Sequence, residues 1–221
     1  MQTHFPTRRS LLAASLGAAT LGIAPAVGAQ TRIEMAPDIA LWHMGRPVPS
    51  PGQVITVQVL FSYFSRHSRE FDPYLDQWMP TLPRHVQVER VAVAQGDVQT
   101  GLQRLFYALA MTGQIAQVHA SLYAEASNHR SWHPTQDYLV EFAQRHRLDA
   151  GQLIGAWQAF STITRVAAAQ RIYDTVPARG MPSILVANTF SFGLPQVSGM
   201  SADQAYRRTL QFAGEVIQRL S

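Results

Sequence analysis

Three residues that could carry out covalent chemistry stand close together in the sequence: Ser65, His67 and Ser68. A serine becomes a nucleophile when an adjacent base accepts its proton, and histidine is the base used most often. A helix that starts here would add an oxyanion site at its N-terminus. However, no acidic side chain that would orient the histidine is evident. Hydrolysis at Ser65 and His67 is therefore one hypothesis, and a helix-capping serine beside a surface histidine is the alternative.

A second set of polar residues, Glu125, His129 and His133, has the spacing of one helical face. A carboxylate and two imidazoles placed in this way could bind zinc or nickel. Ser127, Asn128 and Pro134 indicate that the helix ends in this region, which would break that geometry. We therefore expect a solvated helix end with incidental histidines, and no metal site.

The composition excludes several classes of chemistry. The 221 residues include no cysteine, and all 18 basic residues are arginines. Thiol chemistry, iron–sulfur clusters, cysteine-ligated zinc and lysine Schiff bases are therefore impossible, and we expect no cofactor. The 47% apolar content is enough for a folded core without disulfides. The arginines are scattered, so the net charge of +4 indicates a general preference for acidic partners rather than nucleic-acid binding.

Residues 1–29 have the pattern of a signal peptide. Arg8 and Arg9 precede an apolar run from Leu11 to Ala24, and small residues follow at 27–29. The run is shorter than the ~20 apolar residues that a membrane-spanning helix needs. We expect cleavage before Gln30, export to the periplasm and no stable insertion in the membrane. The paired arginines fit a twin-arginine signal, and a plain secretory signal fits the same residues.

The mature chain begins with a proline-rich lead-in, residues 30–53, for which we expect extended backbone. Residues 54–64 then predict a central strand, with Ile55, Val57, Val59, Phe61 and Tyr63 on one face. A helix is expected from Ser65 to about Met79, and a second strand over residues 86–93. The pattern is helical from residue 97 to about 173, where Trp157 and Phe160 are expected in the core. Two short strands, 183–186 and 189–192, and a helix from about Ala202 complete the chain.

This order predicts an α/β protein whose sheet carries an inserted helical domain. Residues 54–96 and 179–221 would form the domain that contains the sheet. Residues 97–178 would form the helical insertion.

The segment from Phe61 to Pro73 resembles the active-site segment of the DsbA family of periplasmic thiol:disulfide interchange proteins. That family has Phe-Phe-Ser-Phe-Phe-Cys-Pro-His-Cys followed by an aromatic and an acidic residue, where this chain begins Phe-Ser-Tyr-Phe-Ser-Arg-His-Ser. Arg179–Ser183 resembles the Arg-Gly-Val-Pro segment of the family, whose proline is cis and faces the active site. Segments of the helical domain are also similar, so the likeness covers residues 41–221. The resemblance implies a thioredoxin-like fold with an inserted α-helical domain.

The departures from the family decide the chemistry. Ser65 and Ser68 replace both cysteines, Arg66 replaces the proline between them, and Val59 stands where many members have a buried acid. Disulfide exchange needs a thiolate, and a serine hydroxyl neither ionises in this range nor forms a disulfide. We therefore expect a redox-inactive pseudoenzyme with no catalytic residue at positions 65–68.

Peptide recognition is the family property that needs no thiol. In the family the backbone beside the cis proline pairs with an extended peptide, and the resemblance assigns this role to Met181 and Pro182. The methionine would add an adaptable apolar contact. We expect the chain to bind peptides or partly folded polypeptides, as a chaperone-like or accessory protein. The alternatives are the hydrolase, a structural subunit of an envelope complex, or a Pro182 that only shapes the sheet.

Overall fold

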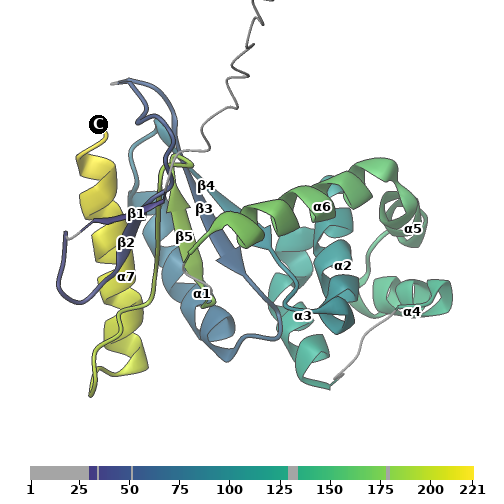
Figure 1. Ribbon diagram of the computed structural model, residues 1–221. Coiled ribbons are helices and arrows are strands. Elements are labelled where there is room, and N and C mark those ends of the chain that lie inside the picture. Colours follow the sequence, from purple (N-terminus) through teal and green to yellow (C-terminus); the bar gives the residue numbers. More distant parts are fainter. Residues whose placement is uncertain (1–29, 34, 51, 129–133, 178–179) are drawn as a thin grey trace, which may run out of the picture.

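The computed structural model describes residues 30–33, 35–50, 52–128, 134–177 and 180–221, so the predicted signal peptide lies outside the described residues. A mixed sheet of six strands forms the centre of one half of the protein (Figure 1). Its strands are β1 (Thr31–Ile33), β2 (Leu41–His43), β3 (Ile55–Phe61), β4 (Val86–Ala92), β5 (Ser183–Val186) and β6 (Phe190–Gly193).

The spatial order of the strands is β1-β2-β6-β5-β3-β4. Strand β3 pairs in parallel with β4 and antiparallel with β5, so it has a neighbour on each side, as its apolar sequence predicts. In the register of β3 and β5, Val59 lies opposite Ile184. The C-terminal end of β3 and the start of β5 therefore meet, which brings the loops at residues 62–65 and 180–182 to the same end of the sheet.

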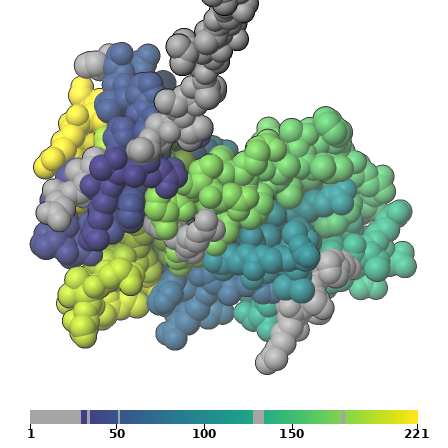
Figure 2. Space-filling view, viewed as in Figure 1, coloured from purple at the N-terminus to yellow at the C-terminus, as the bar shows by residue number. Residues whose placement is uncertain are grey.

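The helices fall into two groups. α1 (Arg66–Trp78) follows β3 and packs beside α7 (Ala202–Gln218), and short 3₁₀ turns cover Met79–Thr81 and Asp97–Gln99. The second group connects β4 to β5 and lies to the right in Figure 1, and α6 forms part of its outer surface in Figure 2. Its members are α2 (Thr100–Met111), α3 (Ile115–Asn128), α4 (Gln136–His146), α5 (Ala150–Gln158) and α6 (Phe160–Thr175). The predicted α/β architecture with a helical insertion is confirmed.

Two clusters of buried apolar side chains lie on opposite faces of the sheet. Because side chains alternate along a strand, Ile184 and Val186 pack with α1 and α7, while Leu185 between them packs with the inserted helices. Val59 is 1% exposed and belongs to the first cluster. The sheet is therefore covered on both faces and can hold the loops at its end in place.

Three sequence expectations differ from the structure. The lead-in contributes β1 and β2, which extend the sheet beside β6. Phe61 and Tyr63 pack with the inserted helices, away from Ile55 and Val57, because β3 ends at Phe61 and the alternation ends with it. Phe160 is 81% exposed, because it is the first residue of α6 and the buried face of that turn is formed by Thr162.

The side chain of Trp157, which was also expected in the core, is partly buried against the helical cluster. Over the described residues, no helix has the length and apolar character to cross a membrane.

Candidate functional site

Ser65 caps the helix that follows the central strand. Its backbone is extended, with φ −93° and ψ 119°, and its hydroxyl accepts a hydrogen bond from the backbone N–H of Ser68 over 3.2 Å. The same hydroxyl donates to the carbonyl oxygen of Met181, also over 3.2 Å. The predicted N-cap is confirmed, and the structure brings Ser65 and Met181 into contact although 116 positions separate them.

The Met181–Pro182 peptide bond is cis, as the resemblance implies. Met181 is 6% exposed, and the hydroxyl of Ser183 donates to the carbonyl oxygen of Gly180 in the same turn. A groove of about 600 Å³ opens beside this turn. Its large apolar side chains come from β2, from the proline turn itself, from the loop after β6 and from α7: Trp42, Met181, Pro182, Leu194, Pro195, Met200 and Tyr206.

His67 is bonded to α7 and not to Ser65. Its Nδ1 lies 2.8 Å from the hydroxyl of Tyr206, and that hydroxyl donates to Glu70 over 2.8 Å. Tyrosine has a single hydroxyl proton, so His67 must be the donor to the oxygen of Tyr206. Glu70 therefore reaches the histidine through Tyr206, a link that sequence spacing could not reveal.

In the part of the chain that the structure describes, no hydrogen bond joins Ser65 to His67. The hydroxyl proton of Ser65 is directed to the carbonyl of Met181. A nucleophilic serine needs that proton directed to a base. These contacts do not favour hydrolysis at Ser65.

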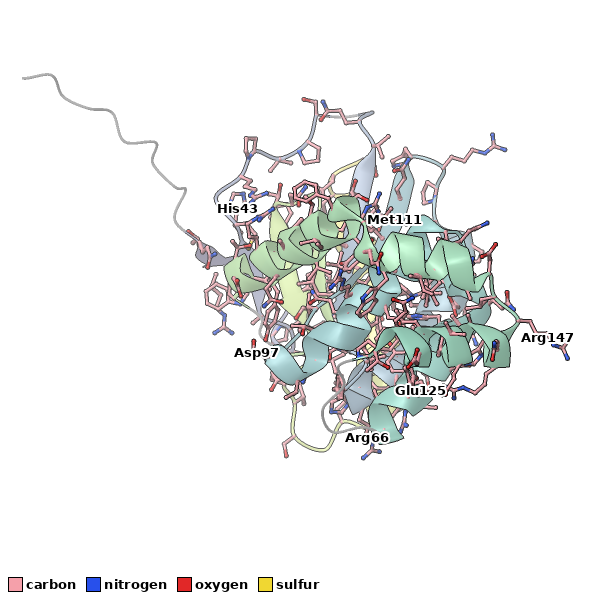
Figure 3. All side chains as sticks on the ribbon, turned by 90° about the vertical axis from the view of Figure 1, so that its right-hand side faces the viewer. His43, Arg66, Asp97, Met111, Glu125 and Arg147 are labelled. Carbon is pink, nitrogen blue, oxygen red and sulfur yellow. The ribbon has the colours of Figure 1, made fainter. Side chains whose placement is uncertain are left out.

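The other two positions of the segment have different surroundings. Ser68 is 2% exposed, and its hydroxyl accepts from the backbone N–H of Ser62 over 3.3 Å. Arg66 lies at the periphery of the molecule, where its side chain is 77% exposed (Figure 3). It pairs with Glu70 over 2.6 Å, and this contact, together with the hydrogen bond from Tyr206, lowers the pKa of Glu70.

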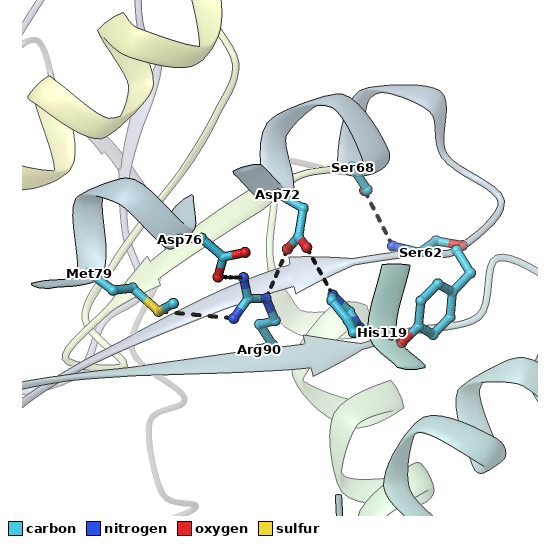
Figure 4. Close-up of polar contacts among 8 residues, drawn as sticks. Ser62, Ser68, Asp72, Asp76, Met79, Arg90 and His119 are labelled. Atoms are coloured by element: carbon cyan, nitrogen blue, oxygen red, sulfur yellow. Dashed lines mark hydrogen bonds and ion pairs between the residues drawn. The ribbon is translucent and has the colours of Figure 1, made fainter. Parts of the chain in front are cut away.

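A polar network under α1 was not predicted from the sequence (Figure 4). Asp72 of α1 lies 2.8 Å from Nε of Arg90 in β4 and 3.1 Å from Nε2 of His119 in α3. Nδ1 of His119 lies 2.6 Å from the hydroxyl of Tyr63, and Arg90 also pairs with Asp76. Burial alone would raise the pKa of Asp72, but His119 and Arg90 outweigh it and lower that pKa. The network joins the inserted helices to the sheet.

In the second predicted set of polar residues, only Glu125 lies within the described residues, and it has a structural role. Glu125 is 8% exposed, and it accepts hydrogen bonds from Tyr138 over 2.6 Å and from Arg145 over 3.0 Å. His129 and His133 lie outside the described residues. Within the described ranges, no three His, Asp or Glu side chains are grouped so that they could hold a metal ion.

Known proteins with the same architecture were found by sequence and by structure. No family model matches the chain. It is 25% identical over 173 residues to the thiol:disulfide interchange protein DsbA of Azotobacter vinelandii, covering 78% of each chain. It is also 25% identical over 185 residues to DsbA of Bordetella pertussis, covering 82% of this chain and 84% of that relative.

Among solved structures, Pseudomonas aeruginosa DsbA superposes with a TM-score of 0.66 at 21% identity, over 79% of this chain and 87% of that one. DsbA of Xylella fastidiosa superposes with a TM-score of 0.60 at 20% identity, over 78% and 91%. The protein therefore has a thioredoxin-like fold with a helical insertion. Within that class, its sequence makes it a homologue of the DsbA family that contains no cysteine.

Proposed function

We propose that this protein binds extended segments of polypeptide in the groove beside Met181 and Pro182, without exchanging disulfides. The observation that carries the proposal is the groove itself, which lies next to the helix-capping Ser65 and has a mostly apolar lining. An apolar groove of this size beside a cis-proline turn suits an extended chain better than a small polar ligand.

The chemistry at the head of α1 supports binding without redox activity. A thiolate at this position would be stabilised by the helix N-terminus. The hydroxyl of Ser65 instead accepts a hydrogen bond from a backbone N–H of its own helix and donates one to a backbone carbonyl in the proline turn. Val59 likewise fills, with an apolar side chain, the strand position where many family members carry an acid. Both substitutions favour a stable scaffold over a redox site.

The predicted export of the protein supports an unfolded polypeptide as its ligand. The predicted signal peptide and the DsbA-type relatives both favour a periplasmic location. Polypeptides that reach the periplasm before they fold expose apolar segments. The proposed role is therefore that of a chaperone-like or accessory protein for such chains.

Fluorescence anisotropy of a labelled, reduced and carboxymethylated polypeptide tests the proposal, since such a chain stays unfolded and offers no thiol. The mature protein should bind it, and Met200→Asp, which places a carboxylate in the groove wall, should weaken binding about tenfold or more. Met181→Asp should have at least the same effect. Val197→Asp is the matched control, because Val197 is 45% exposed in the same loop but does not line the groove. Equal binding by all four proteins would exclude the groove.

A further inference from the structure

A second, smaller hollow is lined by Ser65, which does not itself line the groove. It has a volume of about 140 Å³, the space of four or five water molecules, so it has room for one side chain. Residues 63–66 and 69 form one wall, and Ala126 and Ser127 at the end of α3 form the other. The hollow therefore lies between the capped start of α1 and the helical insertion.

The charge of this hollow is positive. Arg66 and Arg69 are the two charged residues among the described residues that line it, and both are exposed. Arg66 uses Nε to pair with Glu70, which leaves the two terminal nitrogens of its guanidinium for another acceptor. Arg69 has no ion-pair partner among the described residues. Two arginines with free donors are complementary to a carboxylate.

The hollow and the apolar groove are adjacent. The hydrogen bond between Ser65 and the carbonyl of Met181 links them, because Ser65 lines the hollow and Met181 lines the groove. A chain that lies along the proline turn would therefore pass from an apolar environment to a positive one within a few residues.

We propose that the hollow is a subsite for an acidic side chain of the bound polypeptide, so that the preferred ligand has an apolar anchor and, a few residues away, a glutamate or aspartate. This inference rests on the proposed function, because it requires that the neighbouring groove holds the anchor. It adds a charge preference that the groove does not supply, because the described residues that line the groove include no arginine.

The experiment uses fluorescein-labelled peptides with one apolar anchor of two leucines and a single glutamate placed at each position from one to five residues on either side. Each peptide is paired with one in which glutamine replaces that glutamate. For the best position, the glutamate peptide should bind the wild-type protein about three- to tenfold more tightly than its partner, and the difference should shrink at high salt.

Arg69→Gln should abolish the difference in affinity between the glutamate and glutamine peptides. Arg171→Gln should leave it unchanged, because Arg171 is an exposed arginine on α6 outside both hollows and its replacement changes the net charge equally. If glutamate and glutamine peptides bind equally well, the subsite is refuted while the groove stands. If both arginine variants reduce the difference alike, the preference comes from net charge and the subsite is refuted. If no peptide binds, the proposed function fails together with the subsite.

Discussion

The network around Asp72 makes the stability of the protein depend on one carboxylate. We consider Asp72→Asn, which keeps the shape of the side chain and one acceptor oxygen but removes the charge. The change removes the negative charge that faces Arg90 at 2.8 Å and His119 at 3.1 Å, and it leaves an acceptor oxygen for only one of them. The three side chains are only 13–19% exposed, so water replaces these contacts poorly.

The magnitude follows from those contacts. A hydrogen bond to a charged group contributes about 1.5–3 kcal/mol, and part of that remains with asparagine. We expect Asp72→Asn to lower the free energy of unfolding by about 2–3 kcal/mol. For a chain of this size, that corresponds to a fall in Tm of about 5–10 °C. Urea unfolding followed by circular dichroism at pH 7 measures the free energy, and a thermal scan measures Tm.

Asp76→Asn is the matched control, because Asp76 pairs with the same arginine at 2.6 Å but its side chain is 60% exposed. An exposed ion pair contributes about 0–1 kcal/mol, so this variant should lose far less stability. If the two variants are equally stable, or if Asp72→Asn matches the wild type within about 0.5 kcal/mol, the reasoning from burial is wrong.

The pH dependence follows from the same carboxylate. The folded-state pKa of Asp72 is lowered below its unfolded value of about 3.9. The stabilisation is therefore fully present above the unfolded value, and it is lost as the pH falls through the folded pKa. The difference in the free energy of unfolding between the wild type and Asp72→Asn should be constant from about pH 5 to 7. It should narrow at lower pH. A difference that widens at acidic pH would contradict this assignment.

Three further predictions concern the head of α1. The purified mature protein should not accelerate insulin reduction by dithiothreitol, because it has no thiolate; turnover above the protein-free rate would contradict this. Ser65→Ala should cost about 1–2 kcal/mol in urea unfolding through loss of the cap and of the contact with Met181, and an unchanged midpoint would count against both contacts. The double variant Ser65→Cys/Ser68→Cys should form a disulfide and oxidise a dithiol peptide in glutathione buffer, and a double variant that stays reduced would show that the geometry at the helix start differs.

The sequence predicted most of the regular structure because the signals involved are local. Strand β5 was expected over the residues where it occurs, and α1 begins after Ser65 because a serine at a strand-to-helix junction is a favoured cap. β1 and β2 were not predicted as strands, since three residues are too few to show alternation and their pairing depends on β6. The expectation that Phe160 lies in the core is wrong, because helical periodicity does not show at which residue the buried face of a helix begins.

The candidate site was only partly predictable, since its contacts join distant parts of the chain. The resemblance pointed to Ser65, Met181 and Pro182, and the contact between Ser65 and Met181 is consistent with that assignment. The link from His67 through Tyr206 to Glu70 depends on the packing of α1 beside α7, which no local pattern encodes. The same holds for His119 and Asp72, which lie 47 residues apart and meet only when the insertion packs on the sheet.

Mapping of amide chemical shifts tests most directly whether a polypeptide lies beside the proline turn. The ¹⁵N-labelled mature protein would be titrated with a reduced, carboxymethylated polypeptide. The proposal predicts that the largest changes occur at Ser65, Met181, Met200 and Trp42, with α6 unaffected. Saturating polypeptide that leaves these amides unchanged, or that shifts only amides of α6, would contradict the proposal.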